Sequence, residues 1–188
     1  MKFLVIPEDF RKDQYILLPI IQNLLASLGF ANPKVKVCRD PLMGGVTEAL
    51  KKERLAEVFE RYEGMIDVYI LCVDRDADSK RRARLHELET HFHGHASLIA
   101  SDAWEELETW LLAGVELPTD WAWRDVRTAR DVKERYFEPL ARDKGLSSEP
   151  GGGRRTLGRH ASARIQRIRQ LCIEDFDVLA RRLEALRP

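Results

Sequence analysis

The chain has 188 residues, of which 44% are hydrophobic and 33% charged, and its 31 Lys and Arg balance 31 Asp and Glu. This is the composition of a globular protein, and the length suits one domain with a sizeable core. No apolar run approaches the roughly 18 residues of a membrane span, and the opening run is too short for a signal peptide, so we expect a cytoplasmic protein without membrane contacts. Cys38, Cys72 and Cys172 are too scattered for a disulfide framework or a zinc site, and we expect them to be buried.

The first hundred residues alternate between two patterns. Short apolar runs predict strands over residues 2–6, 34–38, 66–73 and 96–101, and helical spacing predicts helices over 15–28, 46–63 and 80–92. This alternation indicates a parallel sheet with right-handed crossovers on both faces. The predicted fold is a compact, Rossmann-like α/β sheet of about four strands flanked by helices.

The remainder of the chain is predicted to be helical. We expect helices over 102–114 and 126–145, the second interrupted near Pro139, a loop over 117–125, and two more helical stretches ending at Leu186. Residues 147–153 (SSEPGGG) are the one obvious flexible segment. The sequence therefore predicts a core over 1–114 and a helical extension over 115–188 that packs on it.

Three carboxylates follow predicted strands. Glu8 comes just after the first strand, and Asp74 and Asp76 come just after the third. If these strands are neighbours, the three side chains converge at the carboxyl ends of the strands, where ligands of such sheets bind. Hard oxygen ligands of this kind suit Mg²⁺ or Mn²⁺. Asp78 fits the role of a turn or N-cap residue best.

A calcium-binding EF-hand loop is excluded. Asp74, Asp76 and Asp78 match its first ligand positions, but Ser79 replaces the required Gly and Leu85 replaces the bidentate Glu. The segment HFHGH (91–95) invites a zinc hypothesis but has no obvious further ligand nearby. Trp121 and Trp123 suit packing against the core better than stacking on bases.

Cations follow the carboxylates and recur near the end of the chain. Lys80, Arg81, Arg82 and Arg84 come directly after Asp78, and residues 147–188 hold 9 Arg against 5 Asp and Glu. A basic element beside an acidic one suits a polyanion that binds through a metal and through its phosphates. A solvated helix face is the alternative interpretation.

These residues resemble the TOPRIM domain, named from topoisomerases and primases and shared by the overcoming-lysogenization-defect nucleases. The segment VIPEDFRKDQYILLPIIQNLL is similar to the first motif of small stand-alone TOPRIM-like proteins, with Pro7-Glu8-Asp9 where that family has Val-Glu-Gly. VDRDAD resembles their second motif, EELETWLLAG their E-x-E-x-W-L-L helix, and FDVLARRLEAL their C-terminal segment. The resemblance spans nearly the whole chain.

The resemblance implies a TOPRIM fold and a nuclease that depends on Mg²⁺ or Mn²⁺. Glu8 would be a metal ligand or general base, and Asp74 and Asp76 would bind the catalytic ion, with Asp78 as a further candidate ligand. Glu108, with Glu106 as a second choice, would complete another metal position about 4 Å away. Nucleic-acid contacts would come from the cluster after Asp78, with Lys80, Arg81 and Arg82 foremost, and from Arg154 and Arg155.

The resemblance also implies partners. Such proteins are often paired with an ABC-type ATPase and are associated with defence against phage, so we expect nucleic acid, DNA rather than RNA, and an ATPase that gates cleavage. Two alternatives remain open. A non-catalytic TOPRIM-like regulatory or binding subunit would keep only a weak metal site. A nucleotide-sugar transferase also uses Asp-x-Asp after a strand, but that activity gives no role to Glu8.

Overall fold

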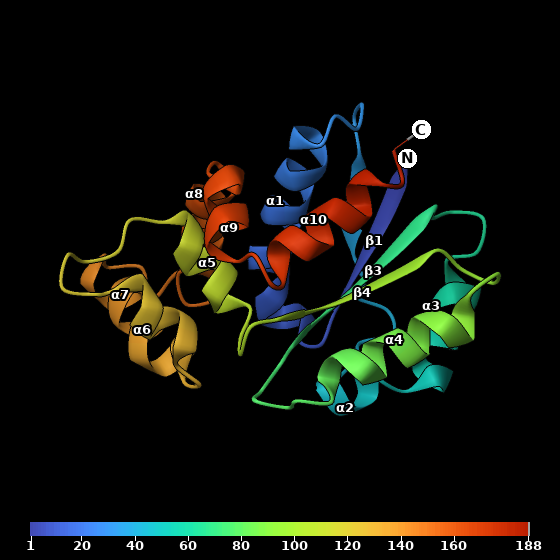
Figure 1. The fold of residues 1–188 in the computed structure, drawn as a ribbon, viewed down its shortest axis with the longest axis horizontal. Helices are drawn as coiled ribbons and strands as arrows, with labels where there is room; N and C mark the ends of the chain where they lie inside the picture. Colours follow the sequence, from blue (N-terminus) through green and yellow to red (C-terminus); the bar gives the residue numbers. More distant parts are fainter. Residues whose placement is uncertain (188) are drawn as a thin grey trace.

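A four-stranded parallel sheet forms the centre of the molecule. The computed structural model describes residues 1–187, and its strands are β1 (Lys2–Pro7), β2 (Lys34–Val37), β3 (Val68–Asp74) and β4 (Leu98–Ala103). Their order is β2-β1-β3-β4, so β1 and β3 are neighbours in the middle of the sheet (Figure 1). The predicted α/β class, the parallel sheet and the number of strands are confirmed.

Alternate residues of the central strands β1 and β3 enter two separate hydrophobic clusters. In β1, Phe3 and Val5 face one cluster, whereas Leu4 and Ile6 face the other. β3 alternates in the same way over its whole length. Both faces of the sheet are therefore buried at β1 and β3, which explains why these two strands are almost continuously apolar.

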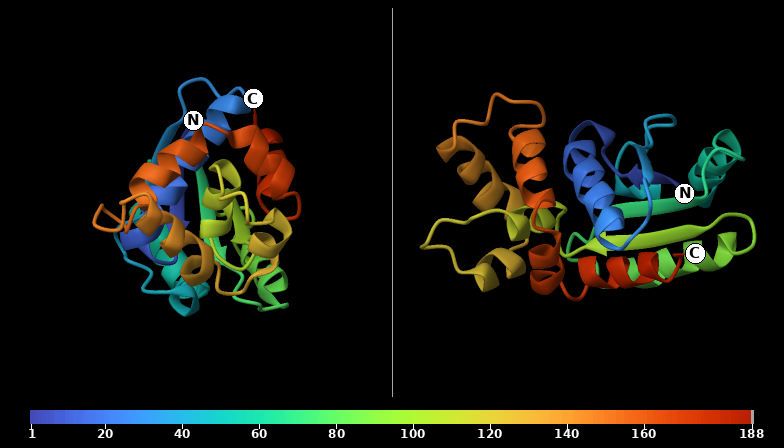
Figure 2. Two further views of the ribbon diagram at one scale, coloured as in Figure 1. Left: turned by 90° about the vertical axis from the view of Figure 1, so that its left-hand side faces the viewer. Right: turned by 90° about the horizontal axis from the view of Figure 1, so that it is seen from above.

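Helices cover both faces of the sheet. On one side lie α2 (Val46–Ala49), α3 (Lys52–Arg61) and α4 (Arg81–Phe92), and on the other lie α1 (Phe10–Ser27) and α10 (Phe176–Glu184) (Figure 1). The elements between β4 and α10 gather beyond the carboxyl ends of the strands (Figure 2). These are α5 (Glu108–Gly114), α6 (Trp123–Thr128), the π-helical turn η1 (Lys133–Phe137), α7 (Glu138–Asp143), α8 (Arg154–Ser162) and α9 (Ile165–Leu171).

The C-terminal helices share a core with the sheet. One hydrophobic cluster contains Phe3 and Ile70 from the strands together with Phe137, Leu157 and Phe176 from the later helices. Cys38, Cys72 and Cys172 are all buried, as expected. Among residues 1–187, the helices include none that combines the length and apolarity needed to cross a bilayer.

Several predicted boundaries are wrong. The expected helix over 102–114 begins only at Glu108. β4 continues to Ala103, whose carbonyl accepts a hydrogen bond from Arg75 N–H. Glu105 then adopts a left-handed backbone conformation (φ 61°), which a helix does not allow. The expected helix over 46–63 is divided by the extended backbone of Lys51. The expected loop over 117–125 gives way to α6 at Trp123, and the C-terminal stretch contains α8, α9 and α10 rather than two helices.

The interruption near Pro139 takes a specific form. Before this proline the chain makes a π turn, in which Glu138 N–H donates to the carbonyl of Lys133, five residues back. Proline has no N–H to give to the residue four positions before it, and a wider turn accommodates that loss. Residues 147–153 form turns in which Gly152 N–H donates to Glu149 and Gly151 packs against Tyr15.

Candidate metal centre

The two central strands place the first predicted carboxylates together. β1 and β3 end side by side, with Pro7 opposite Cys72, so that Glu8 and Asp74 leave the sheet at neighbouring positions. Oε2 of Glu8 accepts a hydrogen bond from the backbone N–H of Asp74 (3.2 Å). Oδ1 of Asp74 in turn accepts from Leu107 N–H (2.8 Å), which ties the strand end to the approach to α5. The expected convergence of Glu8 and Asp74 is confirmed.

A further carboxylate, Asp13, belongs to this group although the sequence analysis did not single it out. Asp9 caps α1 by accepting from Arg11 N–H, and its own N–H donates to Oδ2 of Asp13 (2.9 Å). This reciprocal arrangement holds Asp13 at the start of the helix, where its charge acts on that of Asp74 and is acted on by that of Glu8. The signal available in the sequence was an acid in the first turn of a helix that directly follows Glu8.

Asp76 and Asp78 lie on a tight loop after β3. Asp76 and Ala77 both adopt left-handed backbone angles, and the buried carboxylate of Glu105 accepts from Ala77 N–H (2.7 Å). Asp78 accepts from Lys80 N–H (2.9 Å), as expected for a turn residue. Asp76 is exposed, and its charge acts on that of Glu8.

The predicted cations divide into buried and exposed ones. Arg81 is 7% exposed and lies 3.6 Å from Asp76 and 3.9 Å from Asp78, so it pairs with the loop. Arg154 is also buried and pairs with Glu108. Lys80 and Arg155 are exposed, and among residues 1–187 neither forms an ion pair. Of the cations predicted to contact nucleic acid, Lys80 and Arg155 are thus the two that are exposed and outside the ion pairs of residues 1–187.

Arg82 and Arg84 contact residues other than the predicted metal ligands. Arg82 donates to Asp102 (3.1 Å) and to the carbonyl of Glu174 (2.7 Å), which joins α4 to the start of α10. Arg84 pairs with Glu87 on its own helix. Glu106 accepts from Lys133 N–H (2.6 Å) and so anchors η1.

Burial and like charge act together on the carboxylates. Burial raises the pKa of Glu8 to about 7, partly offset by the N–H of Asp74. Burial also raises the pKa of Asp13 to about 7, with like charge from Glu108 and Glu8 adding to the effect. The pKa of Asp74 lies well above its ordinary value because of burial and then because of Glu8, Glu108 and Asp13. The carboxylates of Glu8, Asp13 and Asp74 therefore repel one another when they are ionised.

The donor chemistry suits a hard divalent cation. Among residues 1–187, no Lys, Arg or His forms an ion pair with Glu8, Asp13 or Asp74, although the nearby charge of Arg81 lowers the pKa of Glu8. As placed, no three His, Cys, Asp or Glu side chains in this part of the chain are close enough to hold one ion alone. Mg²⁺ commonly takes only one or two carboxylates and completes its shell with water and phosphate, and Glu8 with Asp74 meets that requirement.

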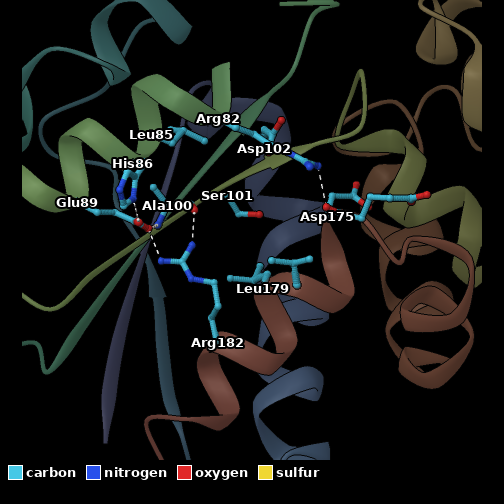
Figure 3. A pocket seen from close by; sticks show the side chains of 12 residues that line it. Arg82, Leu85, His86, Glu89, Ala100, Ser101, Asp102, Asp175, Leu179 and Arg182 are labelled. Atoms are coloured by element: carbon cyan, nitrogen blue, oxygen red, sulfur yellow. Dashed lines mark hydrogen bonds and ion pairs between the residues drawn. The ribbon is translucent and has the colours of Figure 1, made fainter. Parts of the chain in front are cut away.

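A separate cleft of about 440 Å³ lies along the outer edge of β4, between α4 and α10 (Figure 3). Arg182 reaches across it to the carbonyl of Ala100 (3.0 Å) and to Glu89, and Glu89 accepts from Ala100 N–H (2.6 Å). These side chains cover the hydrogen-bonding groups of an edge strand, which otherwise invite pairing with another chain. Glu8, Asp13 and Asp74 do not line this cleft.

Comparison of the chain with protein-family models, with curated proteins and with solved structures gives no match. The geometry of the acidic group is therefore the basis for assigning a function.

Proposed function

We propose that Glu8, Asp13 and Asp74, together with the exposed Asp76, form a site for Mg²⁺ or Mn²⁺, and that the protein is a metal-dependent nuclease. One observation carries this proposal: two neighbouring strands bring Glu8 and Asp74 together, and among residues 1–187 neither of them forms an ion pair. The charge of Asp13, in the first turn of α1, also acts on both. Burying such charge is costly unless something compensates it. A functional site is the usual reason for accepting that cost.

The residues around the group suit a phosphodiester substrate. A bound divalent ion would supply positive charge to the phosphoryl oxygens. Glu8 accepts from the backbone at the end of β3 and so holds Asp74 in place. Lys80 and Arg155 are exposed cations that could neutralise flanking phosphates. The expected ATPase partner, DNA as substrate and a role in phage defence belong to this proposal.

The first test is cleavage of plasmid DNA, single-stranded DNA and RNA with Mg²⁺, with Mn²⁺ and with EDTA. We expect cleavage only with the metals and, for Asp74→Asn, a loss of more than about 100-fold, since even indirect ligand contacts are worth about 10 to 100-fold. Asp67→Asn is the matched control, because Asp67 lies at the opposite end of the same strand and is exposed. Equal cleavage by Asp74→Asn and the wild type would show that the nuclease activity does not depend on Asp74.

A non-catalytic binding subunit is the second candidate. The observation that favours it is the lack of a ready three-ligand cage among residues 1–187. On this hypothesis the purified chain binds Mn²⁺ weakly and cleaves no nucleic acid, either alone or with its ATPase partner. Cleavage that depends on Asp74 excludes this hypothesis.

A further inference from the structure

β2 is an outer strand of the sheet, and its outward edge has no partner strand. The backbone N–H groups of Lys34 and Cys38 donate to carbonyl groups in and just before β1 (3.1 and 2.7 Å). Successive peptide groups of a strand point to opposite sides, so the N–H and C=O of Val35 and Val37 point away from the sheet. Among residues 1–187, no group hydrogen-bonds to them.

The opposite edge of the sheet is covered. Ala100 N–H donates to Glu89 (2.6 Å), and its carbonyl accepts from Arg182 (3.0 Å), so side chains occupy these hydrogen-bonding groups of β4. β2 is protected only by its length of four residues and by its two lysines. Lysines oppose pairing with a positively charged strand, but they favour a negatively charged one. The edge of β2 is therefore open to a strand of opposite charge.

A groove of about 620 Å³ lies at this edge. Its lining comes from the C-terminal half of α1, from the connection to β2 and from β2 itself. Lys34 and Lys36 are its only charged residues, and both are exposed and form no ion pair within residues 1–187. The sequence has no Asp or Glu between residues 14 and 39. The groove therefore carries positive charge that no nearby residue in the sequence balances.

The side chains of β2 alternate in character. Val35 and Val37 are half-buried against the core that α1 helps to form, whereas Lys34 and Lys36 are exposed. A strand added beside β2 places its own side chains in the same alternation, with every second one on the same face as the lysines. A second copy of β2 would set lysines against lysines, which is unfavourable. Alternating acidic and apolar side chains suit both faces.

We propose that the edge of β2 binds an extended acidic segment of a partner protein as an added strand of the sheet. Acidic side chains of that segment lie beside Lys34 and Lys36, and apolar ones lie over the groove. Backbone hydrogen bonds at Val35 and Val37 provide affinity, and the alternation of side chains provides specificity. The inference is independent of the proposed metal centre, because none of the predicted metal ligands lines the groove.

The first test measures binding of a fluorescent peptide of alternating Glu and Val to the full chain by anisotropy. We expect a Kd below about 1 mM that weakens with added salt, and no binding of the matched peptide of alternating Lys and Val. Lys34→Glu/Lys36→Glu should lower the affinity by about 10-fold or more. The control is Lys12→Glu/Lys144→Glu, the same change of charge at two exposed positions outside the groove. Its affinity should stay within about 3-fold of the wild type.

The second test removes backbone donors. Val35→Pro deletes an N–H that faces outward, at a position where edge strands accept proline, and it should weaken peptide binding by about 10-fold or more. If this variant does not fold, the peptide itself provides the answer. Two versions of the Glu-Val peptide are N-methylated at alternate residues, one in each phase. The version whose methyl groups face β2 should lose about 10-fold or more, and the other should bind like the parent peptide.

Each result decides. Equal affinities of the two methylated peptides, or unchanged binding by a folded Val35→Pro variant, would overturn the inference. So would the absence of Glu-Val peptide binding at about 1 mM. Labelled oligothymidine tests the same surface for nucleic acid. If the oligonucleotide binds through Lys34 and Lys36 and the peptide does not, the edge binds nucleic acid and the inference is wrong.

Discussion

At the scale of single residues, Asp9 in the segment Pro7-Glu8-Asp9 stands where the TOPRIM-like motif that this segment resembles has glycine. Asp9 has φ −122° and ψ 93°, an extended conformation open to any residue. Its side chain caps α1, and its N–H holds Asp13. The aspartate therefore adds a cap and orients another carboxylate without backbone strain.

Asp13→Asn tests whether this carboxylate belongs to the acidic group. Asn keeps an oxygen that can accept from Asp9 N–H, and it removes a charge that repels Glu8 and Glu108. Without metal at about pH 8, we expect the free energy of unfolding to rise by about 1–3 kcal/mol. Urea denaturation in EDTA measures this change.

The same substitution should act oppositely on the metal. We expect Asp13→Asn to weaken Mn²⁺ binding by about 10-fold or more, because it removes charge from the site. Asp120→Asn, which alters an exposed carboxylate far along the chain, should change neither stability nor affinity. A variant that loses stability and keeps its affinity would show that Asp13 only supports the helix.

At the scale of elements, the sequence predicts the parts of the site that depend on strand alternation. The apolar runs identify β1 and β3, and their carboxyl ends then bring Glu8 and Asp74 together. Contacts between distant helices leave no such local pattern. The pairing of Arg154 with Glu108 depends on α8 packing against α5. The late start of the helix predicted from residue 102 depends on the pairing of β4 with β3.

Helix packing around α8 gives a testable consequence. A Cβ on Gly158 would lie 2.4 Å from the carbonyl oxygen of Tyr15, so α8 and α1 approach each other closely at this point. Gly158→Ala should destabilise the protein by about 1–3 kcal/mol. In an isolated helix the same substitution would instead stabilise by about 1 kcal/mol. Thermal and urea unfolding measure the difference.

Arg159→Ala is the control for this change, since the side chain is exposed on the neighbouring position of α8. We expect an effect within about 0.5 kcal/mol. If Gly158→Ala stabilises the protein instead, the two helices are further apart than the structure places them.

At the scale of the whole molecule, the placement of the acidic group links stability to pH and to metal. The ordinary pKa values of Glu8 and Asp13 are 4.5 and 3.8, and in the folded protein both are about 7. The folded chain therefore binds more protons than the unfolded chain between these values. The stability that the protonated groups provide is fully present below about pH 4 and is lost as the pH rises through about 7.

The free energy of unfolding of the metal-free protein should accordingly be about 2 kcal/mol lower at about pH 8 than at about pH 5.5. This size follows from about 1.4 kcal/mol for each pKa unit, reduced for solvent screening. Millimolar Mn²⁺ should remove most of this loss, because an ion that binds only the folded state replaces the protons and stabilises it by mass action. Urea denaturation at both pH values, in EDTA and in MnCl₂, measures both effects. The double variant Glu8→Gln/Asp13→Asn should lose the response to Mn²⁺. Its pH dependence between these values should shrink to the part that Asp74 and Glu106 retain, since burial also raises the pKa of these two carboxyl groups. A response to Mn²⁺ that persists in this variant would place the ion elsewhere in the molecule.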